Sequence, residues 1–237
     1  MNAVVTGAGR GLGLEFARQL LPRVTTLIAT VRSPEAAREL AALAKENAGK
    51  LHIIELDVAD EASIHHATKR IAELTPSLDL LINNAGIYPG RPGAVSGSDR
   101  LGQLTMESGV ATLRTNAIGP MILTQELLPL LRKGRQPRIV SLTSGLGSIA
   151  QSSGAPYHYS ASKAALNMYM HGVAAELRRD HIISVVINPG WVATDMGGRG
   201  ASLPTSESVN SILRVVEKLT MEQSGAFFNY RGEIEPW

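Results

Sequence analysis

The 237-residue sequence contains no cysteine and no long apolar run. Without cysteine it can form neither a disulfide nor a thiolate metal site, which is typical of proteins from a reducing compartment. The N-terminus MNAVVTG lacks the charged and apolar regions of a signal peptide. No apolar stretch approaches the roughly 20 residues of a membrane-spanning helix. We therefore expect a cytoplasmic protein with no membrane partner and no metal.

The sequence also lacks a strong excess of either charge. Its 23 Lys and Arg face 21 Asp and Glu, which gives a formal net charge of +2. The densest basic stretch, LRKGRQPR at 131–138, follows a long apolar-periodic segment, and ELRRDH at 176–181 has the same context. Cations are favoured at helix C-termini. We interpret both stretches as helix ends rather than a nucleic-acid surface, and we expect no nucleic-acid partner.

Apolar runs rich in β-branched residues alternate with segments of helical periodicity. The runs are residues 3–6, 25–30, 51–56, 78–82, 138–142, 183–187 and, more weakly, 225–230. The helical segments are 12–21, 35–45, 63–74, 110–131, 159–179 and 206–219. Continuous apolar runs indicate strands covered on both faces, and their alternation with helices indicates parallel strands with right-handed crossovers.

The pattern predicts the α/β class with a doubly wound architecture. We expect one seven-stranded, mostly parallel sheet with helices on both faces. No linker or repeat interrupts the chain, so residues 1–237 are predicted to form a single domain. We expect residues 1 to about 110 to form a cofactor half, and about 111 to 237 a catalytic and substrate half.

The segment VVTGAGRGLGLEF joins the first predicted strand to the first predicted helix. Glycines there allow a tight turn and let backbone N–H groups approach a pyrophosphate at the helix N-terminus. The dinucleotide pattern G-x-G-x-x-G fails because position 12 is Leu12, but T-G-x-x-x-G-x-G is satisfied by Thr6, Gly7, Gly11 and Gly13. An ordinary strand–helix turn is the alternative for this motif alone.

The second predicted strand ends in IATVRSP, with Arg32 and no acid at its tip. An acid at this position binds a ribose 2′-hydroxyl, whereas an arginine accommodates a 2′-phosphate. Arg10 lies within the glycine cluster, and guanidinium groups match phosphate oxygens well. We therefore predict NADP(H) in preference to NAD(H), with Arg10 facing the adenosine end. The alternative is that both arginines are solvated surface side chains.

Further motifs follow the later predicted strands: NNAG at 83–86, TNAIG at 115–119, RIVSLTSGLG at 138–147, YSASK at 159–163 and NPGWVATDM at 188–196. Tyr159 and Lys163 share a helix face about 6 Å apart along the axis. An ammonium near a phenol lowers the tyrosine pKa, which favours Tyr159 as an acid/base. Taken alone, a Tyr/Lys pair at this spacing is typical of a solvated helix surface. Ser144 taken alone is typical of a loop hydroxyl. Asn116 is unusual within a helix and is either a cap or a group that disturbs the helix to bind water.

In order and spacing, the motifs resemble those of classical short-chain dehydrogenases/reductases over nearly the whole chain. The resemblance is carried by TGAGRGLG, NNAG, Asn116, Ser144, YSASK and NPGWVATDM. The segments SLTSGLGSIA and YSASKAALNM and the tail SGAFFNYRGEIEPW are most similar to the C-factor/sniffer-type carbonyl reductases. The resemblance implies a Rossmann fold, NADP(H), and a homodimer or homotetramer built on the helices at 110–131 and 159–179.

The resemblance also implies a catalytic role for four residues. Ser144 would hydrogen-bond the substrate carbonyl, and Tyr159 would donate its proton. Lys163 would hold the nicotinamide ribose and tune Tyr159, and Asn116 would hold a water that links Lys163 to solvent. Tyr157 is a nearby competitor for the tyrosine role, but only Tyr159 has a lysine four residues later.

The implied cofactor contacts are spread over five segments of the chain. Glycines of the first turn would line the pyrophosphate, the LDVAD segment would contact the adenine, and the later motifs would border the nicotinamide. With the two arginines, the predicted set is Gly7, Arg10, Gly11, Leu12, Gly13, Arg32, Asp57, Val58, Asn83, Ala85, Gly86, Tyr159, Lys163, Pro189, Gly190, Val192 and Thr194.

The predicted function is hydride transfer between NADP(H) and a carbonyl or secondary alcohol substrate, with Tyr159 as the general acid/base. Two alternatives stay open: an NADP(H)-binding signalling protein that needs no turnover, and a biosynthetic ketoreductase acting on a carrier-bound substrate. The loop at 88–102 is long and rich in Gly and Pro. The substrate pocket therefore cannot be inferred from the resemblance.

Overall fold

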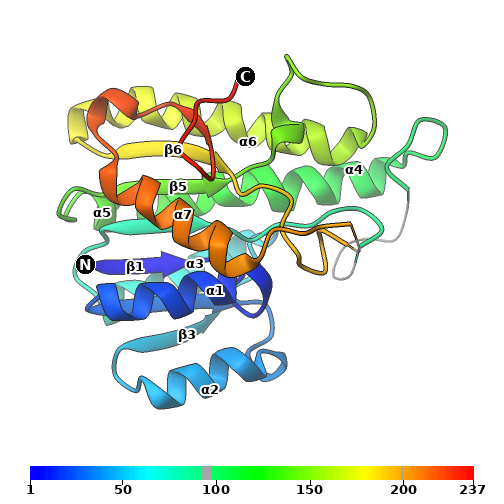
Figure 1. Ribbon diagram of the computed structural model, residues 1–237. Helices are drawn as coiled ribbons and strands as arrows, with labels where there is room; N and C mark the ends of the chain where they lie inside the picture. Colours follow the sequence, from blue (N-terminus) through cyan, green and yellow to red (C-terminus); the bar gives the residue numbers. More distant parts are fainter. Residues whose placement is uncertain (92–97, 199) are drawn as a thin grey trace.

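A computed structural model describes residues 1–91, 98–198 and 200–237. Its centre is a seven-stranded sheet in the order β3-β2-β1-β4-β5-β6-β7 (Figure 1). The strands are β1 (Asn2–Val5), β2 (Thr26–Val31), β3 (Leu51–Glu55), β4 (Leu80–Asn83), β5 (Arg138–Leu142), β6 (Ile183–Asn188) and β7 (Phe227–Asn229). Every pairing between neighbouring strands is parallel, so the predicted doubly wound α/β sheet is confirmed.

Helices cover both faces of the sheet. They are α1 (Gly11–Leu20), α2 (Arg38–Glu46), α3 (Glu61–Leu74), α4 (Met106–Leu113), α5 (Gly119–Leu131), α6 (Tyr157–Glu176) and α7 (Thr205–Lys218). Apolar side chains of α1, α2 and α7 pack on one face of the sheet, and those of α3, α5 and α6 pack on the other. No helix in the described part of the chain is long and apolar enough to cross a bilayer.

The continuous apolar runs follow from this three-layer arrangement. Along β1, Ala3 and Val5 face the core under α1 and α7, whereas Val4 faces the core under α3 and α5. All three side chains are fully buried. Because successive residues of a strand point to opposite faces, a strand with two covered faces must be apolar at every position.

The helix predicted at 110–131 is two helices in the structure. A π-helical segment, Arg114–Ile118, separates α4 from α5, and it contains Asn116. Short π-helical segments are common at functional sites. The apolar periodicity continues through the break, which is why the sequence alone predicted one helix.

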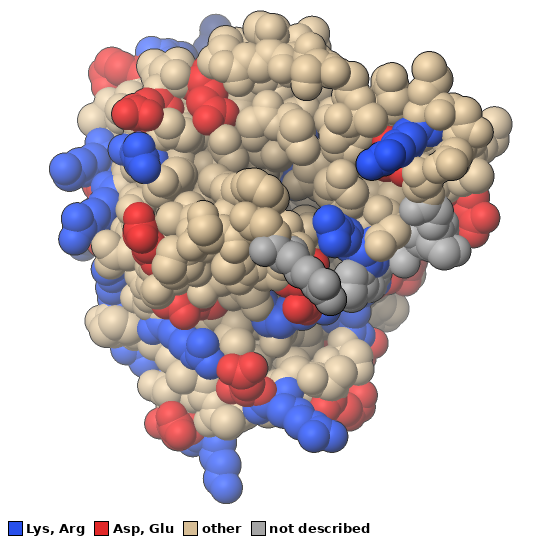
Figure 2. Space-filling view, turned by 45° about the vertical axis from the view of Figure 1, so that its right-hand side comes forward, with Lys and Arg blue, Asp and Glu red and all other residues tan. Residues whose placement is uncertain are grey.

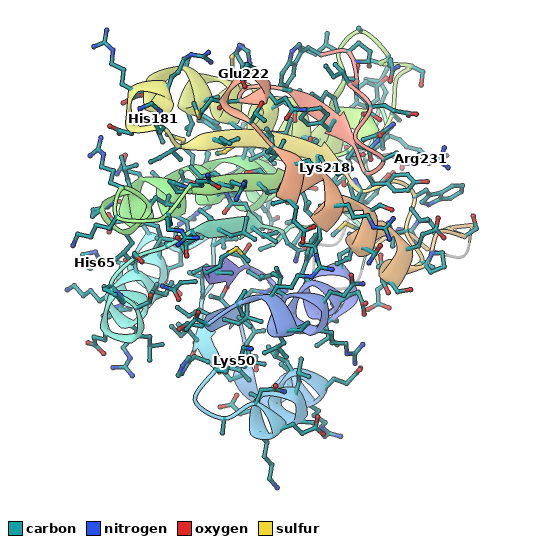
Figure 3. All side chains as sticks on the ribbon, turned by 60° about the vertical axis from the view of Figure 1, so that its left-hand side comes forward. Lys50, His65, His181, Lys218, Glu222 and Arg231 are labelled. Carbon is teal, nitrogen blue, oxygen red and sulfur yellow. The ribbon has the colours of Figure 1, made fainter. Side chains whose placement is uncertain are left out.

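The two basic stretches lie at the amino edge of the sheet, the edge brought forward in Figure 3, where His181 is labelled. LRKGRQPR begins at the last residue of α5, and ELRRDH begins at the last residue of α6, so their assignment to helix ends is confirmed. The Arg132 Nε lies 2.9 Å from the Asp180 Oδ2. The predicted functional motifs follow the opposite, carboxyl ends of the strands, where open α/β sheets bind ligands.

Candidate active site

The glycine turn, which we define as residues 6–13, is held by side chains from β1 and from the end of β4. The Thr6 hydroxyl accepts hydrogen bonds from the N–H groups of Asn84 and Ala85, at 3.0 and 2.9 Å. The Asn84 side-chain amide donates to the carbonyl oxygens of Thr6 and Gly7, at 2.7 and 3.2 Å. The sequence analysis missed Asn84, although it is the second residue of the NNAG motif. These bonds fix the turn against β4.

Glycine is required at two kinds of position in this turn. Gly7 and Gly11 have φ of 65° and 55°, the left-handed region that other residues adopt with strain. A side-chain carbon at Gly13 would lie 2.2 Å from the carbonyl oxygen of Gly7. No side chain among the described residues caps the N-terminus of α1. A tight, glycine-lined turn that leads to an uncapped helix N-terminus fits a pyrophosphate group.

The two predicted arginines lie on different elements. Arg32 follows β2, and its side chain is exposed. Arg10 precedes α1, and its guanidinium makes an exposed ion pair of 2.7 Å with Asp195, in the loop after β6. Arg10 therefore connects the glycine turn to that loop.

Two of the predicted cofactor residues at or just after the end of β4, Asn83 and Gly86, differ in their surroundings. Gly86 lies beside the YSASK motif, because a side-chain carbon there would be 3.7 Å from the Lys163 Nζ. The Asn83 side chain instead points into the core, where it donates to the hydroxyls of Thr124 and Ser141. Only the main chain of Asn83 is available at the carboxyl edge.

Asp57 and Val58 connect β3 to α3 and have structural contacts of their own. The Asp57 carboxylate accepts a hydrogen bond from the N–H of Ala59 at 2.9 Å, and the Ser63 hydroxyl accepts one from the N–H of Asp57. Val58 is buried, and its carbonyl packs against Gly119, where no side chain fits. These contacts hold the β3–α3 connection at the carboxyl edge. A contact with adenine stays a prediction.

Tyr159 and Lys163 lie close together on α6, as their spacing predicted. Both are buried, whereas the spacing taken alone suited a solvated surface. The Lys163 Nζ is 5.8 Å from the centre of the Tyr159 ring, and it donates to the carbonyl oxygen of Leu142 at 2.8 Å. Ser144 follows β5, and its hydroxyl also accepts from the N–H of Leu146 at 3.2 Å. The side chains of Tyr159 and Ser144 form a hydrogen bond that lowers the pKa of Tyr159. Three of the four predicted catalytic residues thus meet at one place.

The pKa values of this pair differ from the sequence expectation. Burial raises the pKa of Tyr159 to about 12, and the hydrogen bond with Ser144 offsets only part of that rise. Burial also lowers the pKa of Lys163 to about 8. The expected lowering of the tyrosine pKa by Lys163 is therefore wrong for this structure, because burial disfavours the charged phenolate by more than the hydrogen bond with Ser144 favours it. Tyr159 is a phenol near neutral pH and is able to donate a proton.

Asn116, the fourth predicted catalytic residue, joins the π-helical segment to the end of β4. Its side-chain oxygen accepts from the N–H of Ile87, and its side-chain nitrogen donates to the carbonyl of Ile87, both at 2.8 Å. The same nitrogen donates to the Ser162 hydroxyl at 3.0 Å. A carbon at Gly86 would lie 3.3 Å from the Asn116 oxygen. Of the two roles expected for Asn116, a cap or a group that disturbs the helix, the structure shows the second. That it binds a water stays a prediction.

The structure distinguishes the two candidate tyrosines. Tyr157 is the first residue of α6 and is 38% exposed, whereas Tyr159 is 8% exposed. The Tyr88 ring, after β4, stacks on the Tyr159 ring with centres 4.6 Å apart. Only Tyr159 combines burial, a hydrogen bond with Ser144 and a neighbouring lysine. Tyr88 was not predicted as a site residue.

Asp99 is a third residue of the site, after Asn84 and Tyr88, that the sequence did not predict. It is buried, and its carboxylate accepts hydrogen bonds from the N–H groups of His158 and Tyr159, at 2.6 and 2.9 Å. The residue that precedes α6 is Pro156, which offers no side-chain cap. Asp99 therefore caps α6 from a distant loop and fixes the main chain of Tyr159. Its setting in a Gly- and Ser-rich loop gave no signal of this contact.

The loop after β6 brings the last predicted cofactor residues to the carboxyl edge. Pro189 accepts a hydrogen bond from the Ser208 hydroxyl, and Gly190, with φ of 82°, packs beneath Tyr230. Val192 pairs with Leu203, and the Thr194 side chain lies against Gly11. The loop thus closes against the glycine turn. Figure 2 brings this edge forward and shows basic and acidic side chains interspersed around its middle.

The chain is similar to known proteins over most of its length. The family model described as short chain dehydrogenase matches residues 1–202. The C-signal protein of Myxococcus xanthus is 42% identical over 165 residues, which cover 69% of this chain and 95% of that protein.

Two solved structures are similar in fold and sequence. The NADPH-bound carbonyl reductase from chicken fatty liver has a TM-score of 0.90 at 35% identity and covers 100% of this chain and 98% of its own. The carbonyl reductase Sniffer of D. melanogaster has a TM-score of 0.91 at 33% identity, with coverage of 100% and 99%.

Proposed function

This chain belongs to the short-chain dehydrogenase family, and we propose that it is an NADPH-dependent carbonyl reductase. The observation that carries the proposal is the arrangement of Ser144, Tyr159 and Lys163 at the carboxyl edge, beside a turn that fits a pyrophosphate. The similarity to two carbonyl reductases supports the same reaction class.

In this proposal the substrate carbonyl oxygen lies between the hydroxyls of Ser144 and Tyr159. Ser144 orients the oxygen by a hydrogen bond, and Tyr159 donates a proton to it as it gains charge. A pKa of about 12 keeps the Tyr159 proton in place near neutral pH until the oxygen becomes basic enough to take it. The same groups serve the reverse reaction, in which Tyr159 accepts the proton.

Lys163 and Asn116 act around this centre. Below a pH of about 8 the buried Lys163 carries a charge, and we propose that it binds the ribose next to the nicotinamide and stabilises the phenolate left after proton transfer. We propose that Asn116 holds a water through its oxygen or its main chain, because Ile87 and Ser162 already accept from its side-chain nitrogen. That water would return a proton to Tyr159 through Lys163.

NADPH, when bound, would supply the hydride. Gly7, Gly11, Leu12 and Gly13 would hold the pyrophosphate, and Asp57 with Val58 would border the adenine. The main chain from Asn83 to Gly86 and the loop residues Pro189, Gly190, Val192 and Thr194 would border the nicotinamide. The exposed Arg32 would bind the 2′-phosphate, with Arg10 as a second contact, since a guanidinium has enough donors to keep its pair with Asp195.

We further propose that the protein is a cytoplasmic homodimer or homotetramer. Helices α4 and α6 pack side by side and carry the exposed apolar side chains Met106, Val110 and Met168. A large apolar side chain that is exposed in one chain is often buried in an assembly. Sedimentation measurements would test this.

A signalling role is the second candidate, and the similarity to the C-signal protein favours it. The two candidates differ in whether turnover is needed. If Tyr159→Phe left the biological effect of the protein intact, the signalling role would gain support over the reductase.

The direct experiment is oxidation of NADPH by the purified protein against a panel of aldehydes, ketones and diketones, with NADH in parallel. We expect turnover with NADPH and a weaker response with NADH. Dissociation constants for Arg32→Ala and Arg32→Asp test the cofactor preference. Loss of one charge-assisted contact should weaken NADPH binding about ten- to a hundredfold and leave NADH binding nearly unchanged. No turnover with any carbonyl, or equal affinity for both cofactors in the wild type, would contradict the proposal.

A further inference from the structure

Arg91 is an exposed residue beside the Tyr88 ring of the candidate active site, and the local sequence orients it. Residues 88–91, Tyr-Pro-Gly-Arg, form a type II turn: Pro89 is second, Gly90 is third with φ of 73°, and the N–H of Arg91 donates to the carbonyl of Tyr88 at 3.0 Å. The turn folds the chain back on itself. As a result, the guanidinium carbon of Arg91 lies 5.9 Å from the centre of the Tyr88 ring.

The Tyr88 ring connects this cation to the reaction centre. One side of Tyr88 carries Arg91, and its ring also stacks on Tyr159 with centres 4.6 Å apart. Burial and the carboxylate of Asp99 raise the pKa of Tyr88, while Arg91 and Arg100 lower it, so this ring lies within the field of two cations. Arg91, Tyr88 and Tyr159 therefore form a row of contacts from an exposed guanidinium to the proposed proton donor.

The guanidinium of Arg91 also contacts the facing loop. A side-chain carbon at Gly198, in the loop after β6, would lie 3.0 Å from the Arg91 Nη1. Arg91 thus lies between Tyr88, after β4, and Gly198, in the loop after β6.

Arg91 differs from Arg10 in its partners. Arg10 pairs with Asp195, but no carboxylate within residues 1–91, 98–198 and 200–237 lies at ion-pair distance from Arg91. The nearby Asp99 carboxylate is occupied by two N–H groups of α6. A guanidinium that is oriented but not paired offers a fork of donors that matches a carboxylate or phosphate.

We propose that Arg91 selects the substrate class by binding an anionic group at the end of the substrate remote from the carbonyl. This inference rests on the proposed function, which supplies the reacting carbonyl at Tyr159. The Tyr88 ring separates the guanidinium from Tyr159, so the anionic group and the carbonyl must be several bonds apart. Extended or aromatic oxo acids meet this condition, whereas α-keto acids do not.

The test uses a matched pair of substrates, 4-carboxybenzaldehyde and its methyl ester, which differ mainly in charge. We expect kcat/KM of the wild type to be about tenfold higher for the acid. Arg91→Gln should bring that ratio close to one, Arg91→Lys should retain part of it, and high salt should reduce it. Lys133→Gln is the control, because it removes an exposed charge beyond α5 at the opposite edge and should keep the wild-type ratio.

Binding of the product alcohols provides a readout that needs no turnover. Calorimetry with 4-(hydroxymethyl)benzoate and its methyl ester, with and without NADPH, should show the same preference for the acid and its loss in Arg91→Gln. Equal turnover and equal binding of acid and ester by the wild type would overturn the inference and leave the proposed function standing. A binding preference that depends on Arg91, without turnover of either aldehyde, would support the anion site and contradict the proposed function.

Discussion

The glycine turn and the polar cluster around Tyr159 lie at the same edge of the sheet but are built differently. At the turn, main-chain geometry makes the site: Gly7 and Gly11 are in the left-handed region, and Gly13 leaves no space for a side chain. In the polar cluster, buried polar side chains make the site, and their partners come from distant parts of the chain. Tyr159 is held by Asp99, and Asn116 binds Ser162.

This difference predicts two kinds of sensitivity. At Gly13 the turn tolerates no added atom, because main chain packs directly on main chain there. The polar cluster around Tyr159 depends on hydrogen bonds to groups that are buried and costly to leave unpaired. Substitutions in the turn should therefore alter folding and cofactor binding together, whereas those in the polar cluster should lower catalysis with a smaller loss of stability.

The largest expected effect is that of Gly13→Ala. The new carbon would lie 2.2 Å from the Gly7 carbonyl oxygen and 2.6 Å from the Asn84 side chain, so the turn must shift. We expect a loss of about 3 kcal/mol or more in the free energy of unfolding, measured by urea denaturation.

The matched control is Gly172→Ala, on α6, where an added carbon meets nothing within 4 Å. Alanine is the better helix former there and should raise stability by up to about 1 kcal/mol. If both variants had the same stability, the turn would not be the rigid unit described above.

A smaller effect is expected for Asp99→Ala, which removes the cap of α6 and the bonds to the N–H groups of His158 and Tyr159. Loss of a cap typically costs about 1 kcal/mol of stability. Because the Tyr159 main chain is released, kcat should also fall, about thirtyfold, with little change in the KM for NADPH.

Asp60→Ala provides the comparison, because Asp60 caps α3 in the same way, away from the tyrosine. It should lose similar stability without loss of kcat. An equal fall of kcat in both variants would mean that Asp99 acts through stability alone. Asp99→Asn, which retains one acceptor oxygen, should restore part of kcat.

The smallest effect concerns pH. The Tyr159 pKa of about 12 means that its proton is present across the working range, so only Lys163, with a pKa of about 8, changes its charge there. Lys163 is charged below that value and neutral above it. We expect kcat/KM for carbonyl reduction to be level below pH 7 and to fall about tenfold by pH 9.

Lys163→Met should have lower activity and no such fall. A decline centred near pH 10, or one that persists in Lys163→Met, would show that another group titrates.

The two regions also differ in how far the sequence alone predicts them. All seven strands and the glycine turn could be predicted, because strands buried on both faces are continuous apolar runs and the turn is a local pattern. The positions of Tyr159 and Lys163 followed from their spacing on one helix. The contacts of Asp99 and Asn84 could not be predicted, since each bridges segments far apart in the chain.

Two further predictions from the sequence differ from the structure for physical reasons. The break between α4 and α5 was missed because the apolar periodicity continues through Arg114–Ile118. The predicted direction of the Tyr159 pKa shift was wrong because burial raises this pKa, and burial depends on the packed structure and not on spacing.

The most direct test of the account compares Tyr159→Phe with Tyr157→Phe in the reduction of an active aldehyde by NADPH. Both changes remove one hydroxyl and keep the ring, but only Tyr159 is buried against Ser144. The account predicts that kcat falls about 10²–10⁴-fold in Tyr159→Phe, with the dissociation constant for NADPH nearly unchanged, while Tyr157→Phe stays near wild type. Normal turnover by Tyr159→Phe would contradict the account, and a fall of kcat in Tyr157→Phe instead would assign the role to Tyr157.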